Sequence, residues 1–164
     1  MASPLFQVLF RDRNLGVRGL EVEVVPGVTA ALACSASLGA ALGQDFAVVS
    51  LSDRFVPWTV ITQRLKAALR SDFVLVLYEP ASRRRPWQMG EAWRLLCRYR
   101  PPHTPVGIVR DATRVGQQVV VTDLAHLLDY ELDMRTTVIV GCSATIAQDG
   151  VMVTSRYHPQ HEDL

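Results

Sequence analysis

Short apolar runs alternate with amphipathic segments along most of the chain. Runs of strand length that are rich in Val and Leu predict β-strands at residues 20–25, 46–52 and 73–78. The last of these runs is apolar at every position, which is typical of a strand covered on both faces. Between the strands, apolar side chains recur at helical spacing. This alternation predicts an α/β domain.

Three segments are expected to be helices. The first covers residues 30 to about 42 and consists mostly of small side chains, so it can pack closely against a sheet. Thr29 precedes it and is a candidate cap, because its hydroxyl can accept a hydrogen bond from an unpaired backbone N–H. The second helix is expected to start at Pro57, and the third opens at Pro86 and stops at Pro101.

The pattern changes toward the carboxy terminus. Residues 105–110, 118–122 and 136–141 predict three strands, residues 150–156 predict a fourth, and between them only 123–130 has a helical pattern. These strands are joined by short links. Together with the alternating first part, they predict a mixed sheet flanked by helices.

Composition limits the classes of protein that need to be considered. The chain has 164 residues, 49% of them hydrophobic and 20% charged, which fits one globular domain. The net charge of +1 gives no strong attraction to nucleic acid or to an anionic membrane. No apolar run approaches the roughly 20 residues of a transmembrane helix, and the start of the chain does not resemble a secretory signal. The three cysteines are scattered, which indicates reduced thiols, a cytoplasmic protein and no metal site.

Four stretches at the ends of predicted strands resemble the tetrapyrrole methylase family. They are VVPGVTAA (24–31), LYEPASRRRPWQ (77–88), TPVGIVRDATRVGQ (104–117) and TTVIVGCSAT (136–145). Their order is similar to the subgroup that methylates C17 of precorrin-3B or cobalt-factor III. Residues 45–53 and 150–157 fit the same pattern, so the resemblance extends from about residue 1 to residue 157.

The resemblance implies two α/β domains with S-adenosylmethionine bound in the cleft between them. The G-P-G and G-D-P-x-x-Y-G motifs of the first domain do not occur here. We therefore expect residues 1–27 to be a remnant helix and strand of the amino-terminal domain, 28–158 to be the carboxy-terminal domain, and 159–164 to be a polar tail. A strand at 20–25 would then lack its partners, and we expect self-association, strand exchange or disorder there.

The resemblance also implies which residues contact the methyl donor. These candidates stand in pairs at four strand ends: Thr29 and Ala30, Tyr78 and Glu79, Asp111 and Ala112, Thr136 and Thr137. Each pair has an ordinary structural explanation as well: a strand-to-helix connection, a solvated carboxylate, a polar turn, or the β-propensity of threonine. The relatives of this subgroup carry Asn where this chain has Glu79, Asp111 and Cys142.

Arg83, Arg84 and Arg85 form a basic run that allows two interpretations. Such a run is usually a solvated loop. Alternatively, the guanidinium groups could bind carboxylates of a corrin substrate in bidentate fashion. The sequence does not decide between them.

The resemblance implies methyl transfer from S-adenosylmethionine to a ring carbon of a precorrin, with ring contraction, in cobalamin biosynthesis. The partners would be a precorrin or cobalt-precorrin and either a second copy or the missing amino-terminal half. Without that half we expect this chain to be inactive. No catalytic residue is named, because donor and substrate hold the reacting atoms. The alternative is a non-enzymatic binding or assembly domain that keeps the fold; a nicotinamide-binding oxidoreductase is disfavoured because no G-x-G-x-x-G follows a strand.

Overall fold

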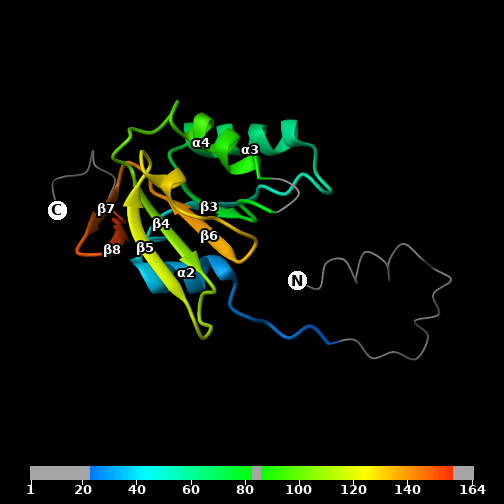
Figure 1. The fold of residues 1–164 in the computed structure, drawn as a ribbon. Coiled ribbons are helices and arrows are strands. Elements are labelled where there is room, and N and C mark those ends of the chain that lie inside the picture. The colour runs from blue at the N-terminus through cyan, green and yellow to red at the C-terminus, as the bar shows by residue number, and fades with distance from the viewer. Residues whose placement is uncertain (1–22, 83–85, 157–164) are drawn as a thin grey trace, which may run out of the picture.

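The computed structural model describes residues 23–82 and 86–156. They form a five-stranded sheet with helices on both faces and a three-stranded sheet at one side (Figure 1). The helices are α2 (Ala30–Leu38), α3 (Trp58–Arg70), α4 (Gln88–Leu96) and the 3₁₀ helix η1 (Leu127–Asp129). The strands are β1 (Gly39–Ala40), β2 (Phe46–Ser50), β3 (Val74–Tyr78), β4 (Pro105–Arg110), β5 (Gln118–Asp123), β6 (Thr136–Val140), β7 (Thr145–Gln148) and β8 (Val151–Thr154).

The larger sheet has the order β2-β3-β6-β4-β5. Strands β2 and β3 are parallel, and α3 provides the crossover between them that a parallel pair needs. Strand β6 is antiparallel to both of its neighbours, and β5 is antiparallel to β4. The sheet is therefore mixed, and the predicted fold class is confirmed.

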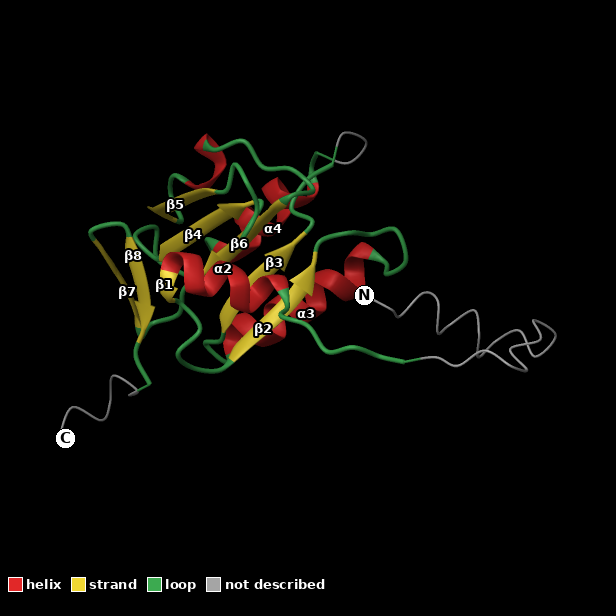
Figure 2. Ribbon diagram, turned by 90° about the horizontal axis from the view of Figure 1, so that it is seen from below, coloured by secondary structure: helices red, strands yellow, loops and turns green. Residues whose placement is uncertain are grey.

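Helices cover the two faces of this sheet unequally. Helices α3 and α4 lie on one face, and α2 crosses the other, which Figure 2 shows from below. The smaller sheet, of order β1-β8-β7, adjoins the end of α2. Within the described ranges, no helix is long and apolar enough to cross a membrane.

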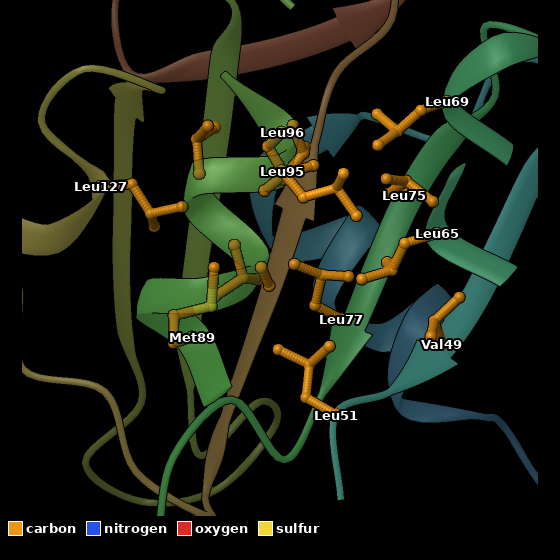
Figure 3. Close-up of a cluster of buried hydrophobic side chains, with 14 of the residues drawn as sticks. Val49, Leu51, Leu65, Leu69, Leu75, Leu77, Met89, Leu95, Leu96 and Leu127 are labelled. Atoms are coloured by element: carbon orange, nitrogen blue, oxygen red, sulfur yellow. The ribbon is translucent and has the colours of Figure 1, made fainter. Parts of the chain in front are cut away.

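Strand β3 separates two hydrophobic clusters. Its side chains alternate, so Leu75 and Leu77 point toward α3 and α4, whereas Val74 and Val76 point toward α2. Figure 3 shows the first cluster, in which Leu77 lies among side chains from the sheet and both helices. The uniformly apolar run at 73–78 is thus a strand covered on both faces, as predicted.

Small side chains let α2 approach the sheet. Leu38, at the end of α2, lies directly over Gly107 in the middle of β4. A Cβ built on Gly107 would come within 2.3 Å of Cδ1 of Leu38, so this contact requires glycine. Leu38 is 1% exposed and has little room to move.

Helix α2 is shorter than predicted. It ends at Leu38 because Gly39 adopts a φ of 117°, and the chain then enters β1 instead of continuing to residue 42. The predicted cap is also wrong in its detail. Thr29 is the N-cap residue, but its hydroxyl makes no capping hydrogen bond.

Several other predictions need correction. Residues 23–25, the described part of the predicted strand 20–25, have no strand structure, and Val24 and Val25 are exposed. The predicted helix 123–130 is reduced to η1. The sequence patterns did not predict β7, whose last three residues are exposed. Pro57 and Pro86 precede their helices and do not lie within them.

Candidate functional site

Four chain segments meet at one edge of the larger sheet. Tyr78 ends β3, Arg110 ends β4, and Thr137 lies opposite both Tyr78 and Val109 near the start of β6. Because β6 is antiparallel to β3 and β4, its first residues lie beside their last ones. The candidate residues from three separate motifs are therefore brought together here.

Helix α2 begins at the same edge and is tied to it by Tyr78. The backbone N–H of Ala31 donates to the Tyr78 hydroxyl at 2.7 Å, and Thr29 Oγ1 lies 2.9 Å from the same oxygen. Tyr78 thus performs the capping that the sequence assigned to Thr29. Its ring is half-buried against the α2-side cluster, while Thr29 and Ala30 are exposed.

The two threonines that open β6 point to opposite faces of the sheet. Thr137 faces α2 and is hydrogen-bonded to Cys34. Burial raises the pKa of the Cys34 thiol, and this hydrogen bond offsets part of the rise. Thr136 faces the other way and donates to Asp133 Oδ1 at 2.8 Å. Only Thr137 therefore lies on the same face as Tyr78.

Asp111 uses its carboxylate within the protein. Its oxygens pair with Arg135: Nε lies 2.6 Å from Oδ1 and Nη2 lies 2.6 Å from Oδ2. The Asp111 side chain is 3% exposed. Ala112 follows in the same turn, half-buried against the α2-side cluster. Thr113 then takes a positive φ of 63°, and its N–H donates to Gln117 Oε1 at 2.6 Å.

Glu79 also has an internal partner. It adopts a φ of 55° directly after β3, and its Oε2 accepts a hydrogen bond from Ser50 Oγ at 2.7 Å. Glu79 lines a small recess with Ser52, Ser82, Gln88 and Met134. The carboxylate is therefore held at the ends of β2 and β3 and is not simply solvated, which was its ordinary structural explanation from sequence.

Neither the basic run at 83–85 nor an open depression of the surface adds a described contact to these residues. Arg83, Arg84 and Arg85 lie outside the described residues. A wide, open depression is lined by Gly43, Gln44, Asp45, Ser71, Asp72, Phe73 and Arg156. It lies beside the residues that precede β2 and β3, at the opposite edge of the sheet from the candidate residues.

Sequence reasoning missed Ser50 and Arg135. The signal for Arg135 is indirect: a carboxylate at a buried strand end needs a cationic partner, but nothing local shows which arginine supplies it. Among the described residues, no group of three or more His, Cys, Asp or Glu side chains is arranged to hold a metal ion.

Comparison with known proteins identifies the family. The model of the Tetrapyrrole (Corrin/Porphyrin) Methylases matches residues 6–128. The chain belongs to this family. The chain is similar to the crystal structure of the methyltransferase CobJ, with a TM-score of 0.84 and 35% identity, over 94% of this chain and 64% of that one. A uroporphyrin-III C-methyl transferase from Thermus thermophilus, complexed with S-adenosyl homocysteine, matches with a TM-score of 0.57 and 26% identity, over 85% of this chain and 58% of that one.

Three curated relatives carry names of the cobalt-factor III or precorrin-3B methyltransferase subgroup. A cobalt-factor III methyltransferase from Priestia megaterium is 43% identical over 156 residues, covering 95% of this chain and 29% of that protein. A precorrin-3B C(17)-methyltransferase from a Sinorhizobium species is 42% identical, covering 86% of this chain and 58% of that protein. A probable cobalt-factor III C(17)-methyltransferase from Salmonella typhimurium is 43% identical, covering 84% and 57%. This family member thus spans less than two thirds of each of these relatives.

Proposed function

We propose that this chain supplies one side of the S-adenosylmethionine site of a methyltransferase that acts at C17 of precorrin-3B or cobalt-factor III, in cobalamin biosynthesis. The observation that carries the proposal is the meeting of Thr29, Tyr78, Ala112 and Thr137 on one face at one edge of the sheet. Relatives at 42% and 43% identity carry that activity in their names.

The residues at this edge suit an adenosine group. Ala112 is small and half-buried, so a flat ring could lie close to its backbone. The hydroxyls of Thr29 and Tyr78 lie together at the start of α2, where they can donate or accept hydrogen bonds. Thr136 and Asp111 are already engaged with Asp133 and Arg135, so we assign them supporting roles and not donor contacts.

The chemistry places modest demands on this half of the site. S-adenosylmethionine, when bound, supplies an electrophilic methyl group. The residues of this chain orient the donor and exclude water, which aligns the methyl group with the substrate carbon. No nucleophile is required of the protein, because the substrate carbon accepts the methyl group.

The opposite side of the site would come from an amino-terminal domain or from a second copy. Val24, Val25 and Val28 lie in the segment that precedes α2, and each is more than half exposed. Exposed apolar side chains that lie together in sequence can mark a surface that a partner covers. We include association through residues 23–28 in the proposal, whether as a homodimer or with the amino-terminal half.

Transfer of a labelled methyl group to cobalt-factor III tests this proposal. The chain is assayed alone and mixed with the amino-terminal part of the Sinorhizobium relative. Product in the mixture, reduced by A112L but not by A125L, is the expected result, because Ala112 lies at the site and Ala125 is exposed elsewhere. No transfer by a folded and associated mixture would favour a non-enzymatic binding or assembly domain.

A further inference from the structure

Asp111 and Arg135 form a pair directly before Ala112 of the proposed donor site. The Asp111 carboxylate is nearly inaccessible, whereas the Arg135 side chain is 56% exposed. A buried carboxylate is unfavourable unless it is paired and hydrogen-bonded. Arg135 meets this need in full, since its guanidinium contacts both carboxylate oxygens in bidentate fashion.

The same arginine also holds the backbone of the turn. Asp111 is the first residue after β4 and has a φ of 52°, a left-handed conformation that non-glycine residues rarely adopt. Its N–H donates to the carbonyl oxygen of Arg135 at 3.1 Å. Arg135 therefore fixes the residue before Ala112 through both its side chain and its main chain.

Arg135 is itself anchored. Its N–H donates to Asp133 Oδ1 at 2.9 Å, and the same oxygen accepts the Thr136 hydroxyl. Asp133 also pairs with Arg110, whose Nη2 lies 2.9 Å from Oδ2. The loop that precedes β6 is thus a clamp on the end of β4, built from two neighbouring Arg–Asp pairs.

We propose that Arg135 is a positioning residue for donor binding: it neutralises the buried Asp111 carboxylate and so holds the turn that presents Ala112. This inference rests on the proposed function. It predicts that Arg135 is needed for donor binding only while residue 111 carries a negative charge. Replacing Asp111 with the neutral Asn should therefore make the loss of Arg135 much less harmful to donor binding.

The experiment measures S-adenosylhomocysteine affinity by calorimetry, with the amino-terminal part of the Sinorhizobium relative present. R135A is expected to weaken donor binding at least about tenfold, because it removes the charge-assisted hydrogen bonds to Asp111 that hold the turn before Ala112. The double variant D111N/R135A is expected to bind within about threefold of the parent, because no unpaired carboxylate remains. R98A is the matched control. It removes an exposed arginine just after α4, outside the cluster around Asp111 and Asp133, and donor affinity is expected to be unchanged.

A spectroscopic readout separates positioning from general stability. The amide signals of Ala112 and Thr113 should shift in R135A and return toward their original positions in D111N/R135A. Unchanged donor affinity in R135A, or a double variant as weak as R135A, would overturn the positioning role. If the parent mixture binds no donor, the proposed function fails and this role fails with it. Thermal unfolding of the four proteins would then still test the Asp111–Arg135 pair, which predicts that R135A is less stable than D111N/R135A.

Discussion

Removal of the Tyr78 hydroxyl should destabilise the domain, because that one oxygen ties α2 to the sheet. The Y78F substitution keeps the ring packed against the α2-side cluster and removes two interactions. The first is the 2.7 Å hydrogen bond from the Ala31 N–H, and the second is the 2.9 Å contact with Thr29 Oγ1.

The structure sets the size of the effect. The Thr29 hydroxyl makes no capping hydrogen bond, so the Ala31 N–H would lose its cap, and losing an N-cap costs about 0.5–2 kcal/mol. The contact with Thr29 is exposed and adds at most about 0.5 kcal/mol. We expect the free energy of unfolding to fall by about 1.5 kcal/mol.

Urea unfolding followed by circular dichroism measures this change. With a slope of about 2 kcal/mol per molar, the midpoint should move down by roughly 0.7 M. Y130F is the control, because the Tyr130 side chain is exposed, and T29V should cost less than Y78F. A Y78F midpoint equal to that of Y130F, or a T29V loss larger than that of Y78F, would refute the assignment of the cap to Tyr78.

Three further predictions concern packing, pH and association. G107A should lower the free energy of unfolding by about 1–3 kcal/mol, measured by urea unfolding, because the added methyl collides with buried Leu38. Burial alone would raise the pKa of Asp133, but hydrogen bonds from Arg110, Thr136 and the Arg135 backbone outweigh it and leave the pKa lowered. The stability from these bonds is present at neutral pH and should be lost as the pH falls below about 4, so D133N should flatten the acid limb of the stability profile. Replacing Val24 and Val25 with Ser should weaken self-association or association with the amino-terminal half, measured by sedimentation velocity; unchanged association would place that surface elsewhere.

The main elements were predictable because their patterns are local. The all-apolar run at 73–78 reflects a strand that is buried on two faces. The spaced apolar residues of α3 reflect a helix that is buried on one face. Strand β7 was missed because most of its side chains are exposed, so it carries no burial pattern. The end of α2 depended on the conformation of Gly39, which sequence does not specify within a run of small residues.

The candidate site was predictable only in outline. The ends of β3 and β4 do meet the start of β6 and the start of α2 at one edge of the sheet. The sequence could not show which side chains remain free to contact the methyl donor, because that depends on contacts between residues far apart in the chain. Asp111 is engaged by an arginine 24 positions away, and Thr29 by a tyrosine 49 positions away. Thr136 and Thr137 are not equivalent, because adjacent residues of a strand point to opposite faces.

Calorimetric titration of S-adenosylhomocysteine is the most direct test of the donor site. It is performed on the chain alone and on its mixture with the amino-terminal part of the relative, with A112L and the A125L control in parallel. Saturable binding in the mixture, abolished by A112L and kept by A125L, is the predicted result. Absence of binding with both parts folded and associated, or binding that A112L leaves unchanged, would contradict the assignment of this edge of the sheet to the methyl donor.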